Sequence, residues 1–255
     1  MANVGTNGAS LYQANIASSA SVATDSNGVF IAGSAFSSVV IQTFTGDGTF
    51  TPSSGMKFCV IECVGGGAGG GGSISTAGGL SVGSGGGSGE YARGRFTASD
   101  IGASKAVTIG AGGGGNSGTT GSNGGTTSVG ALITALGGTG GTTTSLAIVK
   151  SISTPGGAGG TGGSGGSYRV NGNQGGLGWA SATDNMAIGG SGNGSPYAGS
   201  VNSASIVDSA IAQTTVGTAA TGYGGGGGGA LTYVTATAQL GGAGSGGIVV
   251  ITEYI

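Results

Sequence analysis

Five residues placed between glycine-rich stretches have side chains suited to non-covalent binding: Tyr168, Arg169, Trp179, Tyr197 and Tyr223. Connecting segments on a rigid scaffold are where recognition residues concentrate. Tyr and Trp offer a large contact area at little entropic cost and are favoured at interface hot spots, and an arginine can meet a phosphate or carboxylate. We expect these residues to form a binding surface; the alternative for each is local packing against the glycine segments.

Catalytic chemistry has little support in this sequence. The chain contains no histidine, which excludes Ser-His-Asp and Cys-His nucleophile systems and imidazole metal ligands. No glycine is followed by Lys and then Ser or Thr, so a P-loop is absent. A glycosidase-like carboxylate pair could be drawn from Glu90, Asp184 or Asp208, but nothing in their spacing supports one. We expect no enzymatic activity, no metal and no cofactor.

The charge pattern argues against a nucleic-acid partner. Six basic and eight acidic residues give a net charge of -2, and the basic residues are spread from Lys57 to Arg169, whereas duplex binding depends on clustered Lys and Arg. Glu62 lies among apolar residues, while Arg93 and Arg95 share one face of another predicted strand. Glu62 and one of these arginines form either a buried ion pair or two unrelated solvated charges.

The two cysteines lie four residues apart in a strand-like segment, KFCVIECV. On one face of a strand, Cys59 and Cys63 would be about 13 Å apart, beyond the roughly 7 Å between Cα atoms that a disulfide allows. We therefore predict two buried free thiols that act as small apolar residues.

Glycine dominates the composition and suggests how the chain folds. The sequence has 67 Gly and only 3 Pro, which excludes a collagen helix, and 36% apolar residues, too many for a solvated coil. Residues 156–167 form four Gly-Gly-x triplets. This period matches polyproline II, with three residues per turn, and it leaves two of three edges without side chains. We predict packed polyglycine-II helices; the alternative is a flexible linker.

Short β-strands are the elements expected to position the binding residues. Segments rich in Val, Ile, Thr and aromatic residues predict strands at 56–64, 89–98, 105–112, 145–153 and 246–255. The first and last of these should pair across nearly the whole chain. Gly46-Asp47-Gly48 between two β-like runs predicts a tight hairpin. Residues 131–136 and 207–213 could form short helical turns at most.

The domain organisation follows from these patterns. Residues 1–37 are rich in Ser, Ala and Asn and are expected to be an N-terminal attachment segment, followed by a glycine-rich domain over 38–255. We predict an all-β fold, a glycine-rich β-sandwich with packed polyglycine-II helices and long variable loops. No apolar stretch approaches the roughly 20 residues of a membrane span, and the N-terminus lacks a signal-peptide pattern, so we expect synthesis and retention in the cytosol.

Several motifs together resemble a known family. These are TFTGDGTFTPSSGMKFCVIECVGGGAGGGG, GEYARGRF, KAVTIGAGGGG and GGIVVITEYI, and they resemble the glycine-rich domain of bacteriophage tail-fibre and tail-tip receptor-binding proteins. The resemblance covers roughly residues 38–255. It implies an all-β adhesin with polyglycine-II helices and variable loops, assembled as a homotrimer. Only about 37 residues precede the domain, whereas such fibres usually have a long shaft, so the chain could be a short fibre or a docking tip.

The resemblance also implies a function and a location. It implies a virion tail-fibre protein, assembled in the host cytoplasm, that recognises the host cell surface by non-covalent binding. Its partners would be an outer-membrane protein or surface glycan, and other tail or fibre proteins through the N-terminal segment. The alternative is a purely structural virion component, such as a fibre collar or decoration protein. An ice-binding or matrix protein is a third hypothesis. An ice-binding protein would need a flat array of Thr or Ala side chains, and the Thr residues of this sequence are spaced too irregularly to form one.

Overall fold

The computed structural model describes residues 23–24, 30–31, 38–74, 79–146, 151–181, 183–184, 186–203, 205–206, 213–233 and 237–255. The chain divides into two units, residues 1–37 and 38–255. In the first unit, strands β1 (Ala23–Thr24) and β2 (Phe30–Ile31) pair antiparallel. The remainder of the expected attachment segment lies outside the described residues.

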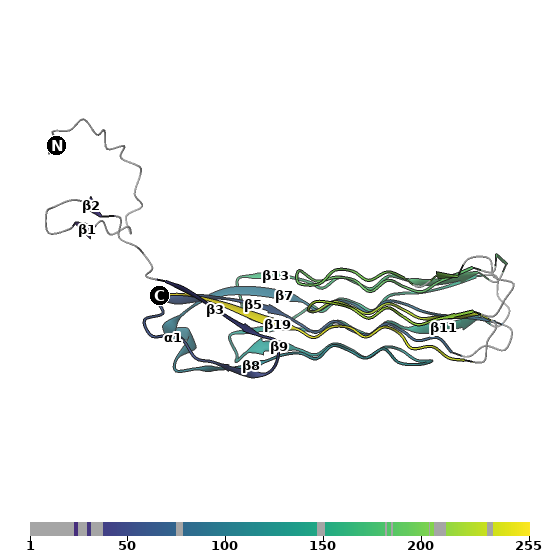
Figure 1. Ribbon diagram of the computed structural model, residues 1–255, viewed down its shortest axis with the longest axis horizontal. Coiled ribbons are helices and arrows are strands. Elements are labelled where there is room, and N and C mark those ends of the chain that lie inside the picture. Colours follow the sequence, from purple (N-terminus) through teal and green to yellow (C-terminus); the bar gives the residue numbers. More distant parts are fainter. Residues whose placement is uncertain are drawn as a thin grey trace, which may run out of the picture. The chain divides into compact units, whose positions relative to one another are not determined.

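A β-sandwich forms one end of the second unit (Figure 1). Its five-stranded sheet, here the basal sheet, has the order β13 (Tyr168–Val170), β7 (Tyr91–Thr97), β5 (Phe58–Val64), β19 (Ile248–Tyr254) and β3 (Val39–Phe44). The facing sheet has the order β10 (Ile133–Ala135), β9 (Thr127–Val129), β8 (Lys105–Thr108) and β4 (Gly48–Phe50). Strands β5 and β19 pair antiparallel over their whole length, which confirms the predicted pairing of the two ends of the domain.

The core of this sandwich lies between the two sheets. Alternate residues of β5, namely Cys59, Ile61 and Cys63, are fully buried and pack with Phe50 and Ile133 of the facing sheet. Both cysteines are free and buried, as predicted. Burial raises the pKa of each thiol to about 12. They therefore act as small apolar core residues.

The predicted hairpin around Gly46-Asp47-Gly48 is wrong. Strand β3 pairs with β19 in the basal sheet, whereas β4 pairs with β8 in the facing sheet. The turn carries the chain from one sheet to the other because Phe50 is fully buried and Phe44 packs against the same core. The Asp47 carboxylate accepts a hydrogen bond from the Ile109 backbone N–H at 2.8 Å, which holds the turn against the segment after β8.

Glycine runs extend side by side from the sandwich (Figure 1). The central run, residues 65–73, is buried throughout and changes its hydrogen-bond partner with a period of three. Gly66, Gly69 and Gly72 donate to carbonyls of one neighbouring run that lie three residues apart, at 2.9, 2.9 and 3.0 Å. The other positions donate to the runs 84–90 and 239–245, and the central carbonyls accept from Gly113, Gly138, Gly141, Gly227 and Ala230. The central run thus bonds to six neighbours, and each of its nine buried backbone N–H groups donates a hydrogen bond.

Close backbone approach explains why these positions are glycine. A Cβ on Gly67 would lie 1.9 Å from the Gly225 carbonyl oxygen, and one on Gly87 would lie 2.0 Å from the Ala158 oxygen. In the peripheral triplets of 156–167, the third-position side chains Ala158, Thr161, Ser164 and Ser167 are exposed. The runs carry the three-residue periodicity that polyglycine-II packing requires; their assignment as polyglycine-II helices stays a prediction.

Two four-stranded sheets form the opposite end of the unit, the end that contains β11 in Figure 1. The first distal sheet has the order β11 (Thr143–Leu146), β6 (Leu80–Gly83), β18 (Leu231–Tyr233) and β17 (Gln213–Thr215). The second distal sheet has the order β12 (Ser151–Thr154), β14 (Gly178–Ser181), β15 (Met186–Ile188) and β16 (Ser205–Ile206). They pack face to face through Leu80, Val82 and Leu231 against Ala180 and Ala187.

Some strand and helix predictions need correction. The predicted single strand 145–153 is two strands, β11 and β12, which belong to different distal sheets. Residues 133–135 form strand β10 rather than a helical turn, while 207–212 lie outside the described residues. Within the described residues, one short helix occurs, α1 (Ala98–Ile101), and its N-terminus is capped by Thr97 with Asp100. The protein is all-β, as predicted, and no helix of the described residues is long and apolar enough to cross a membrane.

Candidate functional site

The structure divides the five predicted binding residues between the two ends of the unit. Tyr168 and Arg169 lie on β13, at the edge of the basal sheet. Tyr197 and Tyr223 form a backbone bridge with each other and pack against Val64, Tyr91 and Ile248. Trp179 lies on β14, in the second distal sheet. The central run between the two ends has nine residues, and at the polyproline-II rise of about 3.1 Å per residue it would span roughly 28 Å.

Arg169 is part of an ion pair with a buried carboxylate. Its guanidinium lies 2.7 Å from Glu90 Oε1, and the two side chains are 24% and 1% exposed. Its five N–H donors are all used, because Nε and Nη2 donate to Glu90 and the others reach the carbonyls of Thr134, Ser164 and Gly165. The Glu90 carboxylate also accepts from the backbone of Leu136 and Gly163. This geometry gives Arg169 a structural role, joining the sandwich to the glycine runs.

Tyr197 is also held by a carboxylate. Its hydroxyl donates to Glu62 Oε2 at 3.0 Å, and the Tyr91 hydroxyl donates to Glu62 Oε1. Arg93 Nε lies 3.7 Å from the same carboxylate, with Arg93 53% and Glu62 27% exposed. Of the two open alternatives, the ion pair with Arg93 is present, but at the surface. Burial, together with the adjacent Glu62 charge, raises the pKa of Tyr197 to about 12.

Tyr168 is exposed, unlike the other predicted binding residues at the basal end, Arg169, Tyr197 and Tyr223. Its ring meets that of Tyr91 edge to face, with centroids 6.2 Å apart. It lines a cavity of about 260 Å³ together with Val60, Arg93, Gly94, Arg95 and Ser167. The Arg95 guanidinium lies over the Phe58 ring, 4.0 Å from its centroid. Because Arg93 is paired with Glu62, both arginines that line this cavity contact a neighbouring group.

Trp179 lies in a different environment, on the face of the second distal sheet that points away from the first. Its strand neighbour Ala180 is buried against the first distal sheet, and side chains alternate between faces along a strand. Across the sheet, Trp179 is aligned with Ser153, Ile188 and Ser205. Trp179 and Ile188 are half-buried, while Ser153 and Ser205 are exposed. We call this row, together with Leu177, the Trp179 face.

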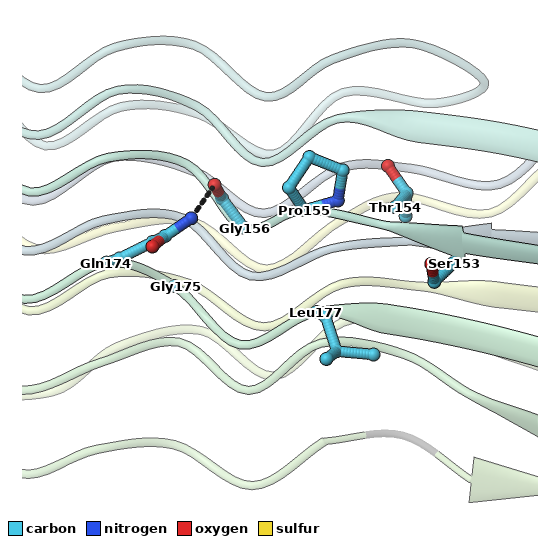
Figure 2. Close-up of a pocket in the computed structure, with 7 residues that line it drawn as sticks. All are labelled: Ser153, Thr154, Pro155, Gly156, Gln174, Gly175 and Leu177. Carbon is cyan, nitrogen blue, oxygen red and sulfur yellow. Dashed lines mark hydrogen bonds between the residues drawn. The ribbon is translucent and has the colours of Figure 1, made fainter.

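A cavity adjoins the Trp179 face where the strands meet the glycine runs (Figure 2). It measures about 340 Å³ and is lined by Ser153, Thr154, Pro155, Gly156, Gln174, Gly175 and Leu177. Figure 2 shows the Leu177 side chain standing clear of its segment, and the Gln174 amide donates to the Gly156 carbonyl at 3.1 Å. Sequence reasoning missed Leu177, although an apolar residue two positions before Trp179 in a glycine run was an available signal.

The described residues hold no group of three or more His, Cys, Asp or Glu that could bind a metal ion. The chain is an all-β protein whose sheets are joined by buried glycine runs. It belongs to the glycine-rich domain family, because the family model matches residues 42–254. Comparison with curated proteins gives no match.

Proposed function

We propose that this protein is a bacteriophage tail-fibre or tail-tip protein that recognises the host cell surface by non-covalent binding and has no catalytic function. The observation that carries the proposal is the separation of two ends by a bonded scaffold. Residues 1–37 precede β3 of the basal sheet, and the six-neighbour bonding of the central run supports a stiff connection to the distal sheets. Such a scaffold suits a protein that is attached at one end and presents a binding surface at the other.

The proposed location is the virion tail, with assembly in the host cytoplasm, and residues 1–37 are proposed to contact other tail or fibre proteins. The receptor is a host outer-membrane protein or surface glycan. Of the five residues predicted for binding, Trp179 suits this role best, since it belongs to the distal end and to a face that carries exposed neighbours. Arg169, Tyr197 and Tyr223 are engaged in contacts within the unit.

A purely structural virion component is the second candidate. The observation that favours it is the local packing of Tyr197 and Tyr223, because an adhesin is expected to gather its aromatic residues at one exposed end. Under this hypothesis, the distal sheets would contact neighbouring virion proteins rather than a cell.

Binding of the labelled protein to cells distinguishes the two candidates. Purified protein is applied to a panel of Gram-negative strains, including strains that lack individual porins or outer-core sugars. Saturable binding that is lost in one mutant strain and weakens on Trp179→Ala is the expected result. Folded protein that binds no strain would favour the structural component.

We also propose that the chain self-associates, as the homotrimer implied by the resemblance. Support comes from the basal sheet, whose edge strand β3 exposes Val39 and Ile41 on one face and contains neither charge nor proline to protect its edge. Ile41→Glu should reduce the mass measured by light scattering. Val216→Glu is the matched control, because Ile41 is 65% and Val216 56% exposed. A monomeric wild-type protein would contradict the proposal.

A further inference from the structure

The Trp179 face and the adjoining cavity combine an apolar platform with hydroxyl and amide groups. Leu177 is 58% exposed, and Trp179 and Ile188 are half-buried beside it. Ser153 is exposed next to Trp179, and its hydroxyl has no hydrogen-bond partner within the described residues. The side-chain amide nitrogen of Gln174 donates to the Gly156 carbonyl. The side-chain oxygen of Gln174, Oε1, is an acceptor at the cavity wall. The apolar area comes from the Trp179 face and the polar groups from the cavity, and an apolar surface with a few placed polar groups is typical of small-ligand sites.

The chemistry of the cavity restricts what it can hold. None of its seven lining residues is charged, so it offers neither a cation for a phosphate or carboxylate nor an anion for an amine. Its volume of about 340 Å³ is near the lower end of the roughly 300–1,000 Å³ of ligand sites. A small, neutral group is therefore favoured.

A peptide strand is disfavoured as the occupant. Strand β12 is the edge of the second distal sheet, and Pro155 follows it directly. Proline has no N–H to donate and is a residue that blocks strand addition. A sugar ring meets the remaining requirements, because its C–H face is apolar and its rim carries hydroxyl groups that pair with serine and amide side chains.

We propose that the Trp179 face binds a neutral saccharide, with the ring seated on Trp179 and Leu177 and its hydroxyls bonded to Ser153 and Gln174. The inference rests on the proposed function for its biological role, since the saccharide would belong to a host surface glycan. It does not depend on that function for its test, which uses isolated sugars.

Trp179 is the only tryptophan in the chain, so its fluorescence reports directly on this face. The protein is titrated with the methyl glycosides of glucose, galactose and N-acetylglucosamine and with outer-core oligosaccharide released from a Gram-negative host. A saturable change of Trp179 emission is expected for at least one of these sugars. Leu177→Gln should weaken that binding about tenfold by removing buried apolar area.

Two controls separate binding from folding. Leu240→Gln removes an apolar side chain of matched exposure, 54% against 58% for Leu177, and should leave the affinity unchanged. By calorimetry, Trp179→Phe should retain binding within a few fold, whereas Trp179→Ala should abolish it, and urea unfolding establishes that each variant is folded.

The outcomes are distinguishable. No emission change with any of these sugars at tens of millimolar, or an equal loss in Leu177→Gln and Leu240→Gln, overturns the saccharide site. Cell binding without saccharide binding also overturns it but leaves the attachment function standing. Saccharide binding without cell binding supports the site and counts against the attachment function.

Discussion

Gly67→Ala tests the reason for glycine in the central run. The new Cβ would lie 1.9 Å from the Gly225 carbonyl oxygen and 2.3 Å from its carbon, whereas real Cβ atoms keep at least 3.0 Å from such neighbours. The two runs must therefore separate. That oxygen accepts from Ser245 N–H at 2.9 Å, and Gly67 N–H donates to the Ser245 carbonyl at 2.9 Å, so both bonds are strained by the separation.

The cost can be worked out from these contacts. A buried backbone group left unsatisfied costs about 1–3 kcal/mol. Replacing glycine by alanine stabilises the folded state by about 0.4–1 kcal/mol, because it lowers the conformational entropy of the unfolded chain. The net loss for two bonds is about 2–5 kcal/mol of the free energy of unfolding. At roughly 2–4 °C per kcal/mol for a domain of this size, the melting temperature should fall by about 10 °C.

Gly114→Ala is the matched control. Gly114 lies in a peripheral run, and a Cβ there would meet nothing within 4 Å, so the variant should be neutral or slightly more stable, by about 0.4–1 kcal/mol. Thermal unfolding of both variants is followed by circular dichroism and by Trp179 fluorescence. The argument from close approach would be refuted by a Gly67→Ala protein as stable as wild type, or by equal destabilisation of the two variants.

Four further predictions concern the ion pair of Arg169 with Glu90, the two buried thiols and the exposed edge at Ala158. Glu90→Gln should lower the free energy of urea unfolding by about 3 kcal/mol, because it leaves the Arg169 guanidinium without its buried counter-ion; an unchanged midpoint would contradict this. Burial raises the pKa of Cys59 and Cys63 from 9.0 to about 12, so at pH 8 iodoacetamide should modify neither thiol until urea unfolds the protein, as mass spectrometry would detect. The same shift should make stability fall as pH rises from about 9 toward 12, since the unfolded state releases these protons first. Ala158→Leu, at an exposed third position, should change stability by less than about 0.5 kcal/mol, and a larger loss would mean that this edge is packed.

Features that depend on local pattern were predictable from the sequence. The β-branched and aromatic content of 58–64 and 248–254 predicted two strands, and their similar length and composition predicted their pairing. The spacing of Cys59 and Cys63 placed both thiols on one strand face. The Gly-Gly-x repeat predicted a period of three with side chains on one edge, because a residue without Cβ is needed wherever two backbones touch.

For other segments, only the tertiary structure decided which partner each one meets. Gly46-Asp47-Gly48 has the composition of a hairpin turn, but burial of Phe50 between two sheets sends β4 to β8 instead. Trp179 was expected in a loop, and the strands β12 and β15 on either side of it make its segment part of a sheet.

The tertiary structure also decided which charged side chains form ion pairs. The ion pair of Arg169 joins it to Glu90, which is fully buried and lies 79 positions earlier in the chain, and no local pattern in the sequence indicates this pairing. Local propensity and periodicity are encoded in neighbouring residues and can be read directly. Ion pairs, sheet order and the shared surface of Trp179 and Leu177 arise between distant segments, and the packing of the whole domain determines which of them meet.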